Sequence, residues 1–200
     1  MPTYTWPGLG RHPSGTIDRL TGAQVTISEE HWLTHKGLTF AMSHRFAAVA
    51  NAASVNLLLK NPAGNYPHLH KIDVIVEDGD VDMFGFEGVV VSADGTPLVA
   101  GNTNRASSNT PTLEIFHTPT ITDDGTQIWQ DWAPPTAAGA GGGGGGGGAG
   151  ARHEGIIYSP VGDEWILAPD TNYVLRHTNN SGGAIDILVR IMFYELPASL

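Results

Sequence analysis

The sequence predicts an all-β protein: an antiparallel β-sandwich of jelly-roll type with an extended N-terminal arm and a long Gly-rich loop. Charged residues make up 15% of the chain, whereas Gly (26) and Pro (13) are abundant, which suits a loop-rich β protein. Roughly nine to eleven short runs alternate between apolar and polar residues and are separated by turn signals. Helical periodicity is almost absent, so two packed sheets are the expected architecture.

The totals limit the classes of function. A chain of 200 residues fits one domain with a sizeable core. The net charge of −10 disfavours nucleic acid as a partner, because few cations are present to neutralise phosphates. Cysteine is absent, so disulfides and thiolate metal sites are excluded. No signal peptide or bilayer-length apolar run is evident, and we expect a soluble protein with no membrane partner.

Residues 1–35 are expected to form the extended arm, and residues 36–200 the sandwich domain. Prolines and glycines interrupt the arm, yet Tyr4, Trp6 and Leu9 are too apolar for a purely solvated tail. The arm either docks on a neighbouring subunit or folds back on its own domain. Within it, Val25 to Ile27 could form a short strand, and Ser28 could cap one helical turn.

The next segments read as strands. We expect residues 38–49 and 54–60 to pair with each other around a turn at residues 50–53, and residues 69–76 to lead into a central stretch, residues 81–118. This stretch reads as strand, turn, strand, loop and strand. Its turn is the Asp-Gly sequence of residues 93–96, where Gly95 is free to adopt a positive φ. Its loop, residues 101–110, is rich in Asn and Ser, which can cap their own backbone.

Residues 121–132 contain a second Asp-Gly turn, and the glycine segment of residues 133–152 follows. Eight consecutive glycines, Gly141 to Gly148, have no side chains for a core and predict a flexible loop. Short strands are expected at residues 155–158, 164–168 and 173–177.

The last strand is the clearest. Ile185, Ile187, Val189, Ile191 and Phe193 form one apolar face. Leu188, Met192 and Tyr194 make the opposite face half apolar, which is typical of a central strand or of a strand against another subunit. These three residues, with Tyr4, Trp6 and Leu9, are the predicted contacts with a protein partner or with another subunit.

No pattern predicts catalysis. His31 and His35 stand four apart, and His68 and His70 two apart, but the Glu that accompanies such a metal motif is missing, so surface or interface histidines are the preferred interpretation. Residues 78–82 alternate acidic side chains but lack the final Glu of a calcium loop, which favours a hairpin. No nucleophile elbow or phosphate loop occurs. We expect no enzyme activity, no metal and no cofactor.

Trp129, Trp132 and Trp165 flank the glycine segment. They fit plugs at the ends of the sandwich, and alternatively contacts with carbohydrate or protein.

The chain resembles a family of tailed-bacteriophage virion proteins described as structural or head-decoration proteins. The resemblance covers most of residues 20–195 and lies in the order of EEHWLTHKG (29–37), FEGVVVSADGT (86–96), NTNR (102–105), FHTPTITDDGT (116–126), EWILAPDTNYVLRHTN (164–179) and ILVRIMFYE (187–195). The chain departs from the family in its longer glycine segment and in Trp32 between the paired histidines. The resemblance implies a capsid decoration, or cement, protein on the virion surface, made in the host cytoplasm, that binds the major capsid protein and forms a homotrimer.

Two other functions stay open. One is a tail- or fibre-associated module that binds a receptor glycan through its tryptophans and glycine loop. The other is a metal-dependent enzyme of the double-stranded β-helix type, built on the two histidine pairs.

Overall fold

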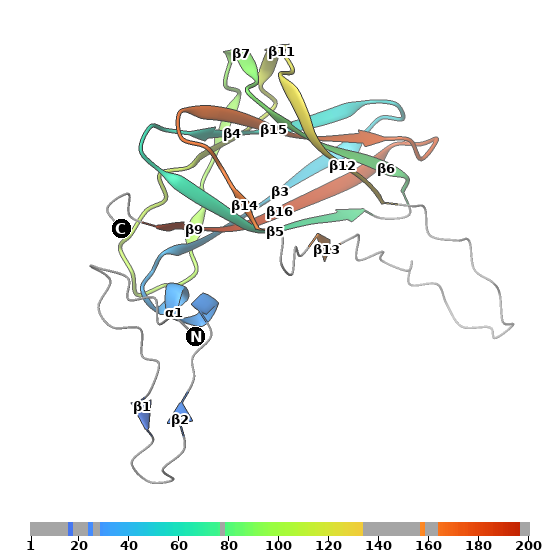
Figure 1. Cartoon of the computed structure of the whole chain (residues 1–200). Coiled ribbons are helices and arrows are strands. Elements are labelled where there is room, and N and C mark those ends of the chain that lie inside the picture. Colours follow the sequence, from blue (N-terminus) through green and yellow to red (C-terminus); the bar gives the residue numbers. More distant parts are fainter. Residues whose placement is uncertain are drawn as a thin grey trace, which may run out of the picture.

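The computed structural model describes residues 16–17, 24–25, 29–76, 79–133, 157–158 and 164–196. The part of the chain that it describes is almost entirely β, with one short helix, α1 (Glu29–His35). Two large antiparallel sheets pack face to face, as Figure 1 shows. The predicted all-β sandwich is therefore confirmed, while the jelly-roll order of connections stays a prediction.

Each sheet has a long central strand pair. The first sheet has the order β13 (Ile157–Tyr158), β5 (Tyr66–Val76), β16 (Ile185–Leu196), β3 (Thr39–Val49) and β9 (Gly101–Asn102), with β14 (Trp165–Ile166) also paired to β5. The second sheet has the order β12 (Thr126–Ala133), β6 (Val81–Glu87), β15 (Thr171–Asn179), β4 (Ser54–Asn61), β10 (Glu114–His117) and β8 (Thr96–Leu98). Two small pairs complete the fold: β7 (Val90–Ala93) with β11 (Thr120–Asp123), and β1 (Thr16–Ile17) with β2 (Gln24–Val25).

The core lies between the two sheets and follows the period-two pattern of the sequence. In β16, one face is completely buried at Ile187, Val189, Ile191 and Phe193, as predicted for a central strand. From the facing sheet, Leu57, Leu59, Met83 and Leu175 are equally buried. Alternation thus identified the inner face of β16 correctly, whereas the inner face of the second sheet comes from the structure.

The predicted pairing of residues 38–49 with residues 54–60 is wrong. The two strands exist as β3 and β4, but they lie in different sheets. Ala48 (φ 50°) and Ala52 (φ 61°) both have positive φ, and the backbone N–H of Ala48 donates to Asp186. The connection therefore carries the chain across the sandwich, where each strand buries its own apolar face.

Polar side chains hold the loop between β9 and β10, as predicted. Asn102 and Asn109 donate from Nδ2 to the carbonyl of Gly37 at 2.8 and 3.1 Å. Gly37 lies two residues after His35, the last residue of α1, and has a φ of 68°, the left-handed conformation common after a helix. The loop thereby fastens the C-terminal end of α1 to the sandwich.

The single helical turn expected after residue 28 is a longer helix in the structure, α1, which has seven residues. Its Leu33 is buried. The glycine run, residues 141–148, lies outside the described residues, as do Tyr4, Trp6 and Leu9 of the expected arm.

Candidate functional site

The feature that stands out from the sandwich is a continuous two-stranded ribbon, which we call the arch (residues 86–98 paired with residues 115–127). Its strand partners keep one register, from Phe86 opposite Gln127 through Ala93 opposite Thr120 to Leu98 opposite Ile115, with one irregularity at Val91. The arch begins in the second sheet as β6 and β12, leaves it as β7 and β11, and returns to it as β8 and β10. Figure 1 shows β7 and β11 projecting above the sheet.

Two pairs of positive-φ residues bend the arch. Gly88 (74°) lies opposite Gly125 (68°), and Gly95 (93°) lies opposite Thr118 (57°). At Gly125, a Cβ atom would lie 2.2 Å from the carbonyl oxygen of Glu87, so no larger residue fits without movement. A Cβ atom added at Gly95 would lie at the same distance from the carbonyl oxygen of His117.

The two Asp-Gly sequences therefore do not reverse the chain. Gly95 has the predicted positive φ, but β7 and β8 do not pair with each other, so the predicted tight turn at residues 93–96 is wrong. The second Asp-Gly sequence likewise bends the ribbon between β11 and β12. An Asp-Gly pair permits a bend as well as a hairpin, and here the opposite strand bends with it.

The arch covers the middle of the second sheet. Leu58 of β4 and Val174 of β15 point away from the main core, yet both are buried. They form a separate apolar cluster with residues of the arch: Phe86, Val89, Val91, Phe116 and Ile121. Burial of this cluster stabilises the arch against the sheet.

Two ion pairs tether the arch on either side of that cluster. Arg176 of β15 donates from Nη1 to Asp124 at 3.0 Å, and Lys60 of β4 donates to Asp94 at 2.7 Å. The Arg176 guanidinium lies 4.8 Å from the ring centre of Phe86, and the Lys60 ammonium 5.7 Å from that of Phe116. Each cation therefore combines an ion pair with a cation–π contact.

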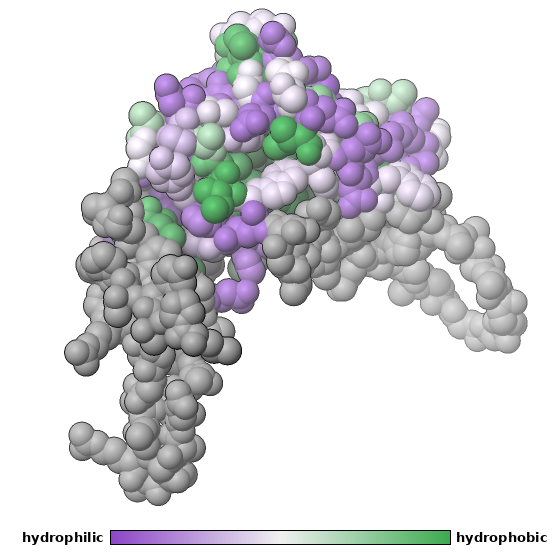
Figure 2. Space-filling view, in the orientation of Figure 1, coloured by the Kyte–Doolittle hydropathy of each residue, from purple (hydrophilic) through white to green (hydrophobic). Residues whose placement is uncertain are grey.

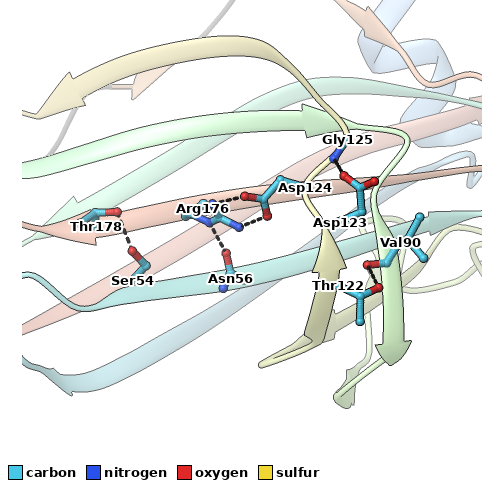
Figure 3. A network of polar contacts seen from close by, with 9 residues as sticks. All are labelled: Ser54, Asn56, Val90, Thr122, Asp123, Asp124, Gly125, Arg176 and Thr178. Atoms are coloured by element: carbon cyan, nitrogen blue, oxygen red, sulfur yellow. Dashed lines mark hydrogen bonds and ion pairs between the residues drawn. The ribbon is translucent and has the colours of Figure 1, made fainter.

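Arg176 also determines the ionisation of its partner. Its hydrogen bond lowers the pKa of the Asp124 carboxyl below the ordinary value. Figure 3 shows this network, in which Arg176 additionally donates from Nε to Asn56 at 2.9 Å. Next to it, the hydroxyl of Thr122 donates to the Val90 carbonyl, and Asp123 accepts the backbone N–H of Gly125.

The upper surface of the arch faces solvent. Val90 is 53% exposed, and Ser92, Ala93, Thr120 and Thr122 are exposed beside it. The surface is uncharged at these positions and combines one apolar side chain with small hydroxyl groups. A rigid projecting surface of this kind is suited to contact with another protein, because little conformational entropy remains to be lost on binding.

Of the six predicted contact residues, the structure describes three. Leu188, Met192 and Tyr194 are half-buried on the outer face of the first sheet, away from the arch. Met192 and Tyr194 border a cavity of about 300 Å³ beside α1, and the ring of Tyr194 stacks on His68 at 4.4 Å. Their role as subunit contacts stays a prediction.

His31 of one histidine pair and His70 of the other border the same cavity beside α1. His31 and His35 contact each other through Nε2 at 2.8 Å, whereas His68 pairs with Glu164 at 3.1 Å and His70 with Glu30 at 3.5 Å. No group of three or more histidine or acidic side chains in the described ranges is arranged to hold a metal ion. In the acidic run at residues 78–82, Asp80 accepts the indole N–H of Trp132 and Asp82 accepts from Asn180.

The tryptophans divide into two kinds. Trp129 and Trp165 meet edge to face at 5.7 Å over Gly85 and close one side of the sandwich, as the plug interpretation predicts. Trp132 is 48% exposed and lies on the outer face.

Sequence reasoning missed the arch. Part of the pattern is visible in the sequence, where Gly95 lies seven residues after Gly88. The equal spacing of Gly125 from Thr118 appears only in the structure, because a threonine gives no sign of its positive φ. Equal spacing of this kind is what two paired strands with common bends require.

Comparison of the chain with protein-family models, with curated proteins and with solved structures returned no match. Among the helices in the described part of the chain, none is long and apolar enough to cross a membrane.

Proposed function

We propose that this chain is a structural virion protein of a tailed bacteriophage, a capsid decoration protein that binds and stabilises the lattice of the major capsid protein. The observation that carries the proposal is the arch. It offers a projecting surface at Val90, Ser92, Ala93, Thr120 and Thr122, where no side chain is charged, on the outer side of the second sheet. The apolar side chains beneath the arch pack against the second sheet, and the ion pairs of Arg176 and Lys60 tether the arch to it.

The resemblance and the arch involve the same segments. Residues 86–96 and 116–126, two of the segments that resemble the phage family, are the two legs of the arch. The segment of residues 164–179 contains β15, which carries Arg176 and Val174 beneath it. The features that suggest a virion protein are thus the ones that build the projecting surface.

The proposed partners are the major capsid protein and two further copies of this chain. In this arrangement the arch contacts the capsid, and the homotrimer contact lies on the outer face of β16, at Leu188, Met192 and Tyr194. The N-terminal arm, with Tyr4, Trp6 and Leu9, straps onto a neighbouring subunit. A monomeric domain at micromolar concentration in sedimentation would exclude the trimer, and unchanged capsid binding after deletion of residues 1–20 would exclude the strap.

The first test is the copy number of the protein in purified particles, measured by gel densitometry against the major capsid protein. Decoration of the lattice predicts a simple ratio, about one or about one third, because symmetric assemblies repeat their contacts. A ratio of a few per cent would place the protein at the tail or a vertex. Absence from particles would refute a virion role.

The second test addresses the arch itself. Val90→Asp places a charge on the arch, and we expect it to weaken binding to capsids lacking the protein by about tenfold or more, since a desolvated charge without a partner costs free energy. Val99→Asp is the matched control, because Val99 is 90% exposed and lies just outside the arch. Equal binding by the two variants would remove the arch from the contact.

A further inference from the structure

A second surface lies on the outer face of the second sheet at its β12–β6 edge, beside the arch. Ile128 and Trp132 of β12 are 42% and 48% exposed, although both are large and apolar. Over the face of the molecule drawn in Figure 2, small hydrophobic areas of the described residues lie among hydrophilic ones. Exposed tryptophan on a sheet face favours contact with a ligand that has both apolar and polar sides.

The Trp132 ring is held in one orientation. Its indole N–H donates to Asp80, and its backbone N–H donates to Oδ1 of Asp131 at 2.7 Å. Since both N–H groups have partners, the exposed part of this side chain offers mainly its aromatic surface. A ring fixed in this way can stack on a ligand with little loss of side-chain entropy.

The strand register places a second aromatic ring near it. Trp132 lies opposite Asp82 and Gln130 lies opposite Phe84, so Trp132 and Phe84 are diagonal neighbours on the same face. Phe84 is half-buried, and the Phe86 ring lies 6.2 Å beyond it, under the Arg176 guanidinium. The platform therefore consists of Trp132 and Phe84, and it ends at Arg176, which tethers the arch. Ile128 is exposed farther along β12, at the register shift between Gln127 and Trp129.

The border of this platform carries amides and carboxylates. Gln127 donates to Gln130 at 3.3 Å, and Asn180 donates to Asp82 at 2.7 Å. The two charged groups that the register and the hydrogen bonds place beside the Trp132 ring, Asp80 and Asp82, are acidic. Arg176, which lies opposite Phe84 on this face, is bound by Asp124. The border therefore disfavours phosphate and carboxylate ligands and suits hydroxyl groups, which both donate and accept.

We propose that this platform binds a neutral sugar, with the apolar face of a pyranose ring on Trp132 and the sugar hydroxyls at Gln130 and the Asp82–Asn180 pair. Addition of a protein strand to the β12 edge is the less favoured occupant, because the Asp131 carboxylate already takes one backbone N–H of that strand. The proposal is independent of the capsid contact assigned to the arch.

The test is a titration of the full chain with neutral hexasaccharides of glucose, mannose, galactose and N-acetylglucosamine, each to about 10 mM, followed by tryptophan fluorescence and calorimetry. We expect saturable binding of at least one, with no binding of a sialylated glycan. Trp132→Ala should weaken it by about tenfold or more, and Gln130→Ala by a smaller factor. Ile166→Ala, at another exposed apolar side chain, should bind as the unchanged chain does.

The proposal would be overturned if none of the four sugars binds. It would also be overturned if Trp132→Ala, shown to be folded by circular dichroism, binds a sugar as tightly as the unchanged chain does. If Trp132→Ala instead loses capsid binding and none of the sugars binds the unchanged chain, the surface contacts protein and the sugar assignment is wrong. Loss of the capsid function through Val90→Asp with sugar binding intact would leave this proposal standing.

Discussion

A histidine buried in the core of the sandwich makes the stability of this protein depend on pH. His177 of β15 is fully buried between Val55 and Met83 on the neighbouring strands, and neither of its ring nitrogens has a hydrogen-bond partner among the described residues. Burial lowers the pKa of His177 from 6.5 to about 4. The ring is therefore neutral in the folded protein over most of the acidic range.

The sign of the effect follows from proton binding. Between pH 6.5 and pH 4 the unfolded chain takes up a proton at His177 and the folded chain does not, so the free energy of unfolding falls as the pH falls. A shift from 6.5 to about 4 corresponds to about 3 kcal/mol in full, most of which is lost between pH 7 and about pH 4.5. Above pH 7 the group contributes no pH dependence.

Two variants that do not titrate isolate this contribution. His177→Gln keeps a polar side chain, and His177→Leu removes the unpartnered nitrogens. Urea unfolding at pH 7 and about pH 4.5 should show each variant losing about 2 to 3 kcal/mol less than the unchanged chain over this interval. At pH 7, His177→Leu should be more stable than His177→Gln by about 1 to 3 kcal/mol, since an unpartnered buried polar group is costly.

Comparing changes with pH removes packing differences that do not depend on pH. The reasoning would be refuted if His177→Gln lost as much stability on acidification as the unchanged chain. That result would mean that the ring has a partner or a water molecule that accommodates its charge.

Three further predictions concern the arch and its surroundings. Gly125→Ala should be less stable than Gly88→Ala by about 1 to 3 kcal/mol in urea unfolding. Both glycines have positive φ, but only at Gly125 would the added Cβ meet a carbonyl oxygen. Equal losses of stability in the two variants would contradict the bend geometry. Asp124→Asn should reduce the loss of stability below about pH 4. Because the pKa of Asp124 is lowered in the folded protein, its contribution to stability is present above the ordinary value of 3.8 and is lost as the pH falls through the folded value. An unchanged dependence of stability on acid pH would show that the Arg176 tether is weak in solution. Glu195→Gln should cost about 2 kcal/mol, because this carboxylate accepts the backbone N–H groups of Thr112 and Leu113, and a stability within experimental error of the unchanged chain would exclude a role for it in holding the loop before β10.

The elements whose residues carry their own pattern could be predicted from the sequence. The alternation of β16 identified its buried face because a strand places every second side chain on the same side of the sheet. The Asn-rich loop was recognised because short polar side chains bond to nearby backbone. The left-handed backbone at Gly95 was anticipated because glycine tolerates it.

The pairing of strands was decided by the tertiary structure. Residues 38–49 and 54–60 look like a hairpin because they are neighbours in the chain, but each buries its apolar face better in a different sheet. The Asp-Gly sequences look like hairpin turns because the preference for positive φ is local, whereas whether the chain bends or reverses depends on the strand opposite. His177 was not singled out, because its burial depends on neighbours far away in the chain.

The sequence by itself therefore determined the all-β class, the inner face of β16 and the Asp-Gly positions where the backbone can bend, since these depend on each residue and its near neighbours. Only the tertiary structure decided that two bends would face each other and form the arch, that Arg176 and Lys60 would lie beneath it, and that Trp132 would be exposed. Those features arise from register between distant segments, which no local pattern encodes.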